Sequence, residues 1–159
     1  MDVWDRERES AQAQARSCDS CTACCHLMGI VDLPGGVKPA NSRCPKQGPK
    51  GCRIYAVRPA SCRQFSCEWL HDGAVRLPAE ARPDKSGVVV WGPLDTDALM
   101  LTVDPAKPEA WREDTIFPAL ERWMTSGRRI LKHCGGRDSW LTMARDGDRG
   151  AWQLTERAM

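Results

Sequence analysis

The sequence predicts an α+β protein in which a cysteine-rich, loop-rich module packs on a small antiparallel sheet with one or two helices. Three observations support this fold class. Eight of the nine cysteines fall within residues 18–67. Residues 33–52 are rich in glycine, proline, asparagine and lysine, and such a stretch cannot sustain a long helix or strand. Residues 87–154 contain short β-branched or alternating runs and one stretch with helical spacing of apolar residues.

Three consecutive segments are expected along the chain. Residues 1–16 contain strong helix formers and no glycine or proline, so they predict an N-terminal helix. Residues 17–71 form the cysteine-rich module, in which 54–70 predicts short helical turns around Pro59. Residues 72–159 predict a small α+β extension. With 159 residues, of which 42% are hydrophobic, the chain is long enough for one compact domain with a real core.

The extension contains several short strands and one clear helix. Apolar residues recur at helical spacing in 108–127, with Gly127 closing the helix and Pro118 kinking it or marking its true start. The first two predicted strands form a hairpin through "PLDTD". The predicted strands are 87–92, 98–104, 128–134, 139–145 and 151–154.

The stretch "CDSCTACC" (18–25) has the spacing C-x2-C-x2-C-C. C-x2-C is the spacing at which one tight turn directs two sulfurs to one metal ion. Cys24 and Cys25 are adjacent and cannot readily chelate one tetrahedral ion together. They therefore point to different ions, or one of them is a structural thiol. The eight clustered cysteines predict two four-thiolate sites or one polynuclear cluster, and a single mononuclear site with spare thiols stays possible.

Charge supports an anionic centre in this module. Residues 16–67 hold eight basic and two acidic residues, a net charge of +6, whereas the whole chain carries +2. Because ligating cysteines are thiolates, a metal–thiolate centre is an anion that this excess positive charge would offset. The same basic residues could contact nucleic acid instead, but only Tyr55 and Phe65 offer stacking faces there, which disfavours that alternative.

The other uses of cysteine fit the sequence less well. The N-terminus lacks an apolar signal segment and no apolar run reaches membrane length, so we expect a cytoplasmic protein with reduced thiols and no membrane association. An odd number of cysteines also disfavours a disulfide framework. Cys134 lies far from the others and is expected to be a buried apolar residue. His26 and His71 are possible ligands, although each is more often a surface residue, and His133 has no supporting neighbour but Cys134.

Two stretches resemble the signature of the YkgJ-type cysteine-cluster family, also described as a zinc- or iron-chelating domain. "CDSCTACC" resembles its C-x2-C-x2-C-C half. "GCRIYAVRPASCRQFSCEW" resembles its C-x-I-Y-x-x-R-P-x-x-C-R-x-F-x-C-x-W half almost position by position. The resemblance covers residues 17–70, about a third of the chain. It implies that metal is chelated by Cys18, Cys21, Cys24, Cys25, Cys44, Cys52, Cys62 and Cys67.

Three functions are compatible with these residues. The first is a metal-binding protein with a structural or metal-carrier role. Zn²⁺ is slightly favoured over iron, although an all-sulfur ligand set suits either metal. The second is an iron–sulfur protein with a redox or enzymatic role. The third is a zinc module that binds nucleic acid or a protein partner. The residues contain no catalytic triad or phosphate-binding loop, so whether the protein is an enzyme stays open.

Arg58 and Arg63 are expected to donate to sulfur or to carbonyl oxygens near the centre. Tyr55 and Phe65 are expected to shield the metal from water, and Pro59 to set the chain direction before Cys62.

Overall fold

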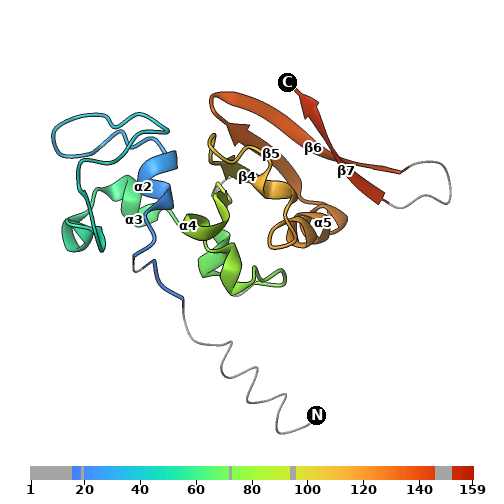
Figure 1. Cartoon of the computed structure of the whole chain (residues 1–159), viewed down its shortest axis with the longest axis horizontal. Coiled ribbons are helices and arrows are strands. Elements are labelled where there is room, and N and C mark those ends of the chain that lie inside the picture. The colour runs from blue at the N-terminus through green and yellow to red at the C-terminus, as the bar shows by residue number, and fades with distance from the viewer. Residues whose placement is uncertain (1–15, 19, 72, 94–95, 146–151) are drawn as a thin grey trace, which may run out of the picture.

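The chain folds into a loop-rich part that carries α2 and α3 beside a part built on a sheet (Figure 1). The predicted N-terminal helix lies outside the described residues, apart from Arg16. This computed structural model describes residues 16–18, 20–71, 73–93, 96–145 and 152–159.

The sheet has five strands in the order β3-β4-β5-β6-β7. All neighbouring pairs are antiparallel except β4 and β5, which are parallel. The predicted strands are confirmed, and β3 and β4 pair antiparallel as the predicted hairpin requires, although residues 94–95 of its turn lie outside the described residues. The strands are β3 (Val88–Trp91), β4 (Ala98–Val103), β5 (Arg129–Cys134), β6 (Arg137–Arg145) and β7 (Trp152–Ala158).

The parallel pair departs from the antiparallel sheet expected from sequence. Parallel neighbours cannot be joined by a tight turn, so the chain between β4 and β5 makes a crossover. This crossover contains the 3-10 helix η4 (Ala110–Arg112) and the helix α5 (Phe117–Thr125). Pro118 marks the true start of the helix, because it lies in the first turn, where its missing N–H is tolerated. Gly127, with φ of +93°, follows the helix end as predicted.

The main core lies around the sheet. The strands β3 and β4 are buried on both of their faces. Successive residues of a strand point to opposite faces, yet Val88, Val89 and Val90 are all buried. The crossover adds Trp111, which is fully buried, and Trp123, so the tryptophans there serve packing. The core therefore consumes most of the apolar residues of the second half of the chain.

The cysteine-rich part contains only short elements, as its composition predicts. The two strands β1 and β2 pair with each other across a two-residue turn. The turns predicted around Pro59 are present as η1, α3 and η2. The elements up to the sheet are α2 (Ala23–Leu27), β1 (Gln47–Gly48), β2 (Gly51–Cys52), η1 (Tyr55–Val57), α3 (Ala60–Gln64), η2 (Glu68–Leu70), η3 (Ala79–Ala81) and α4 (Pro83–Ser86).

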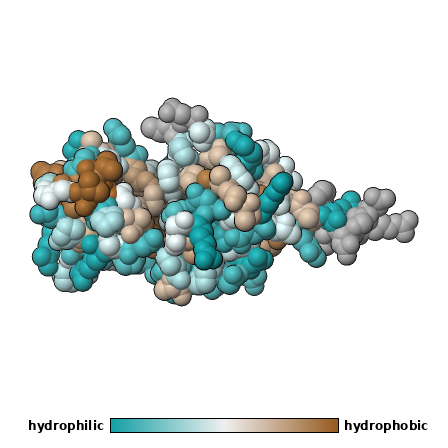
Figure 2. Space-filling view, turned by 90° about the horizontal axis from the view of Figure 1, so that it is seen from above, coloured by the Kyte–Doolittle hydropathy of each residue, from teal (hydrophilic) through white to brown (hydrophobic). Residues whose placement is uncertain are grey.

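A small second core supports this part by itself. It consists of buried Ile30, Leu33 and Cys44, with partly buried Cys25, Ile54 and Cys62 packed around them. Figure 2 shows hydrophobic side chains gathered at the left end of the molecule, where the cysteine-rich part lies. Apart from Met159, the strongly exposed large hydrophobic residues in the described chain all belong to this part: Val31, Val37, Tyr55 and Val57.

The cysteine-rich part joins the sheet at the edge strand β3. Cys67 forms an isolated antiparallel bridge with Trp91, and the Phe65 ring lies 5.7 Å from the Trp91 ring, centroid to centroid. Arg16 donates to the carbonyl oxygens of Trp69 and Leu77, at 3.0 and 2.8 Å. Cys67 consequently belongs to the main core rather than to the small one.

A cluster of polar and charged side chains joins the three strands β5, β6 and β7 of the sheet. Lys132 on β5 is almost buried, and its Nζ lies 2.5 Å from Oε1 of Glu156 on β7. Ser139 on β6 donates to the same oxygen at 2.6 Å. Burial acts to raise the pKa of Glu156, but the hydrogen bonds from Lys132 and Ser139 outweigh it and lower the pKa.

We predict that Glu156→Gln destabilises the protein by roughly 1–2 kcal/mol at neutral pH, since it leaves the buried Lys132 without its anion. A carboxyl whose folded-state pKa is lowered stabilises the fold above its ordinary pKa, and that contribution is lost as the pH falls through the lowered value. The difference between variant and parent should therefore shrink in acid. Urea unfolding between neutral pH and pH ~3 measures it, with the exposed Glu113→Gln as control. A constant difference across this range would contradict the assignment.

Candidate metal centre

The predicted ligands gather around one cavity. Its volume is about 410 Å³, and its wall also includes Met28, Phe65 and Leu70. Cys44 and Cys67, the two remaining predicted ligands, are buried and are not among the residues that line it. The nine cysteines, all within the described residues, form no disulfide with one another. The cysteines that line the cavity are Cys18, Cys21, Cys24, Cys25, Cys52 and Cys62.

The local backbone explains why the first four cysteines face one region. A turn closes between the N–H of Cys21 and the carbonyl oxygen of Cys18, at 2.6 Å. The short helix α2 then carries Cys24 and Cys25 on adjacent positions. Adjacent helical residues leave the helix about 100° apart, yet the thiols of Cys24 and Cys25 remain close enough to interact. This geometry allows Cys24 and Cys25 to serve different neighbours.

The thiol of Cys24 interacts electrostatically with those of Cys18 and Cys21. Cys67, which comes from the junction with the sheet, interacts with the same two thiols. These four residues are referred to below as thiol group 1: Cys18, Cys21, Cys24 and Cys67.

On the other side of α2, the N–H of Cys44 donates to the carbonyl oxygen of Cys25 at 3.2 Å. The thiol of Cys62 on α3 interacts electrostatically with those of Cys25 and Cys44. Cys52 lies opposite Gln47 in the β1–β2 pair, and the N–H of Gln47 donates to the carbonyl oxygen of Cys44. These four residues are thiol group 2: Cys25, Cys44, Cys52 and Cys62.

Backbone N–H groups point at sulfur in thiol group 1. Burial raises the pKa of Cys21, while hydrogen bonds from the N–H groups of Ala23 and Asp84 act to lower it. Burial also raises the pKa of Cys67 to about 11, against hydrogen bonds from Leu70 and Trp69. Such donors stabilise a thiolate more than a neutral thiol. The site therefore provides hydrogen bonds that favour the anionic form, although burial opposes that form.

The adjacent thiols of Cys24 and Cys25 share a hydrogen bond that separates their behaviour. This bond lowers the pKa of Cys25 to about 7, against the effect of burial, and Lys38 adds to the lowering. The same bond, together with burial, raises the pKa of Cys24 strongly. A coupled pair of this kind retains one proton while the other is lost. In the metal-free protein, Cys25 thus ionises first.

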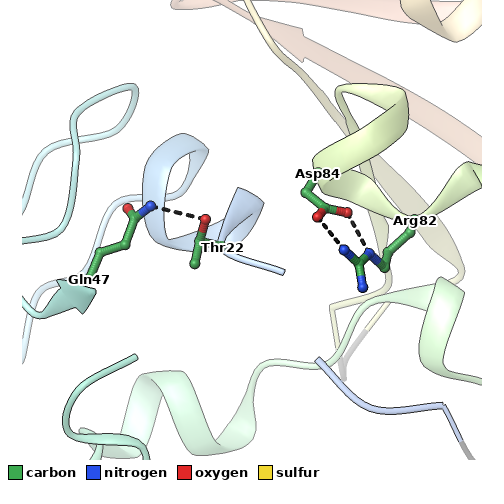
Figure 3. Close-up of polar contacts among 4 residues, drawn as sticks. All are labelled: Thr22, Gln47, Arg82 and Asp84. Carbon is green, nitrogen blue, oxygen red and sulfur yellow. Dashed lines mark hydrogen bonds and ion pairs between the residues drawn. The ribbon is translucent and has the colours of Figure 1, made fainter. Parts of the chain in front are cut away.

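Polar contacts hold the two cysteine segments together. Nε2 of Gln47 on β1 donates to Oγ1 of Thr22, just before α2, at 2.9 Å (Figure 3). A separate contact lies at the start of α4, where Arg82 donates to both carboxylate oxygens of Asp84 (Figure 3). The backbone N–H of Ser61, at the start of α3, donates to Asp32 at 3.0 Å. The sequence did not predict these contacts, because each joins residues that no motif links.

The residues expected around the ligands have mixed outcomes. Arg58 donates to the carbonyl oxygen of Tyr55 at 3.2 Å, and Arg63 donates to that of Arg58 at 2.9 Å. The guanidinium of Arg58 lies 3.9 Å from the Tyr55 ring centroid. Both arginines thus donate to carbonyls, one of the two predicted possibilities. Phe65 and Tyr55 both line the cavity, as expected, although Tyr55 is 55% exposed.

None of the histidines lies among the cavity-lining residues. His26 is exposed, and His71 is exposed and bonds to Ser66 at 2.6 Å. His133 pairs with Asp138 on the sheet at 2.5 Å. Cys134 lies on β5 and is half-buried against the main core, which fits its expected packing role but not full burial.

Donor chemistry and donor placement give different answers about a metal. Thiolates are the ligands that zinc and iron–sulfur clusters take, so the residue types fit. However, no three Cys, His, Asp or Glu side chains in the described part of the chain are arranged as a group that could hold an ion. The thiols of each group share a region but have not converged. Metal binding would therefore require the sulfurs to close around the ion.

Comparison with known proteins finds no match: no family model, no curated protein and no solved structure matches the chain. The resemblance of the two cysteine stretches to the YkgJ-type family therefore stays a prediction that rests on those residues. Within the described residues, no helix is long and apolar enough to cross a membrane.

We predict that iodoacetamide modifies Cys25 first in metal-free protein whose cysteine-rich part is still folded, with a half-maximal rate near pH 7, because the pKa of Cys25 is about 7 in the fold. Cys67, which is buried and has a pKa of about 11, should be among the last to react. Peptide mapping by mass spectrometry after brief alkylation at pH 6 to 9 measures both rates (about two units span the transition). Equal labelling of the two thiols would contradict this order.

Proposed function

We propose that the protein binds metal through its eight clustered thiols, with a structural or metal-carrier role and with Zn²⁺ favoured over iron. One observation carries this proposal. Six of the eight predicted ligands, from three separate stretches of the chain, line one cavity, the other two are buried, and we assign the eight to the two thiol groups. Four thiolates are the ligand number that a tetrahedral zinc ion takes in structural sites. Membership of the YkgJ-type family and a reducing, cytoplasmic setting are parts of the same proposal.

The charge distribution supports a strongly anionic occupant. Eight thiolates around two divalent ions leave a net charge of about −4. Residues 16–67 carry +6, and the two acids in that segment include Asp32, which is engaged by Ser61. A metal–thiolate centre would place its negative charge where the chain has concentrated its positive charge.

An iron–sulfur cluster is the second candidate, and the size of the cavity favours it over a single ion. A volume of about 410 Å³ exceeds what one four-coordinate ion needs, since a water-sized group occupies only about 30 Å³. An iron–sulfur protein would be brown and absorb broadly in the visible range, whereas a zinc protein is colourless. In that case the role would be redox or enzymatic. No specific contact supports the third candidate, a nucleic-acid or protein-binding module.

The proposal predicts metal in protein purified without oxygen from cells, at about two ions per chain if the groups act separately. Elemental analysis together with the visible spectrum identifies the metal. Cys67→Ser and Cys44→Ser should each lose one ion of the two, because they belong to different thiol groups. Cys134→Ser is the matched control and should retain both. Protein that contains no metal and takes up neither zinc nor iron would refute the proposal.

Removal of the metal is expected to unfold the cysteine-rich part while it largely spares the sheet. The small core of Ile30, Leu33 and Cys44 gives this part little apolar burial. A structural metal contributes about 10 kcal/mol or more in small domains. Limited proteolysis after chelation should therefore cut within residues 17–70 and leave 87–145 protected. Unchanged cleavage of 17–70 would show that the metal does not hold the part together.

A further inference from the structure

Lys38 is a buried lysine inside the cysteine-rich part. It is 3% exposed, and its backbone forms an antiparallel bridge with Ile30. Its Nζ donates to the carbonyl oxygens of His26 and Met28, at 3.0 and 2.5 Å. His26 lies in the last turn of α2 and Met28 is its C-cap, so both carbonyls follow Cys24 and Cys25 closely in the chain. The ammonium is therefore held against the end of the helix that carries two predicted ligands.

Within the described part of the chain, this ammonium has no carboxylate partner of the kind that a buried cation requires. Among the described residues, no carboxylate forms an ion pair with Lys38. Burial of an unpaired charge is strongly unfavourable, so such groups are normally paired. Two carbonyl oxygens satisfy two of its three donors and leave one donor. Burial lowers the pKa of Lys38, and the thiolate charges of Cys44, Cys25, Cys24 and Cys62 would act to raise it.

We infer that Lys38 is the internal counter-charge of thiol group 2, which positions and neutralises its thiolates when an ion is bound there. The inference rests on the proposed function and deepens it. Four thiolates around a divalent ion carry about −2, and one buried ammonium offsets half of that charge. Three of the four thiols that act on Lys38 belong to thiol group 2. Lys38 therefore stabilises the anionic complex that the four thiolates form with a divalent ion, and so raises the affinity of this site for the ion.

Thiol group 1 has a different electrostatic surrounding. The cation that acts on its Cys21 is Arg82, which already forms an ion pair with Asp84 at 2.5 Å. Its charge is shared with a carboxylate, whereas that of Lys38 is not. The two groups should consequently differ in their response to loss of Lys38: the affinity of group 2 falls, and that of group 1 stays nearly unchanged.

Zinc titration in competition with a chromophoric chelator tests this assignment, with native mass spectrometry to count bound ions. Lys38→Met removes the charge and the donors. Lys38→Gln removes the charge but keeps an N–H₂ donor for the carbonyls, and Lys38→Arg keeps the charge. Lys50→Met is the matched control, because it removes an equal charge from the exposed loop between β1 and β2. Thermal unfolding of each metal-free variant reports whether it folds.

The expected result is a loss of about 10–100-fold in affinity for one of two zinc ions in both neutral variants, the scale found when a residue behind the ligands is removed. Lys38→Arg should restore most of that affinity, and Lys50→Met should change it by less than about threefold. Unchanged affinity in Lys38→Gln, or equal loss of both ions, would overturn the inference. A parent protein that binds no metal would instead refute the proposed function.

Discussion

The contact between the cysteine-rich part and the edge strand of the sheet is the interaction on which the rest of the structure depends. Trp91 closes β3, forms the bridge with Cys67 and packs on Phe65. Through this contact, a loop-rich segment with a small core of its own packs against a well-packed sheet. Cys67 gains a fixed position in the main core, and the turn after it directs two N–H groups at its sulfur. One predicted ligand, Cys67, is thereby held in place by the well-packed half of the protein.

In the candidate centre, the effect of burial on the thiol pKa values opposes the effect of nearby hydrogen-bond donors and cations. Burial raises the pKa values of Cys21 and Cys67 and so opposes the thiolates that a metal requires. Backbone donors, Lys38 and the surrounding basic residues act in the opposite direction. A divalent ion would settle the balance, because it favours the thiolate far more than a hydrogen bond does. The unconverged thiols of the described structure fit a site whose closure is coupled to metal binding.

Local patterns predicted most of the extension. The β-branched run of β3 and the proline at position 118 each act over a few residues, so their effects are visible in sequence. The parallel pairing of β4 with β5 was not predicted, because it depends on where the crossover returns rather than on either strand. The helix α4 was also not predicted, since its single turn of four residues is too short for a helical repeat of apolar residues to be recognised.

By itself, the sequence determined which side chains could bind metal, since residue type and the C-x2-C spacing are properties of the chain. It also determined the basic charge around them. Only the tertiary structure decided which thiols from distant segments are neighbours. Cys67 interacts with Cys18 and Cys21 although it lies 42 residues beyond Cys25, and Cys62 interacts with Cys25 and Cys44. The burial of Lys38 was decided there too. Grouping and burial depend on how distant segments pack, and packing is set by the whole core rather than by any local pattern.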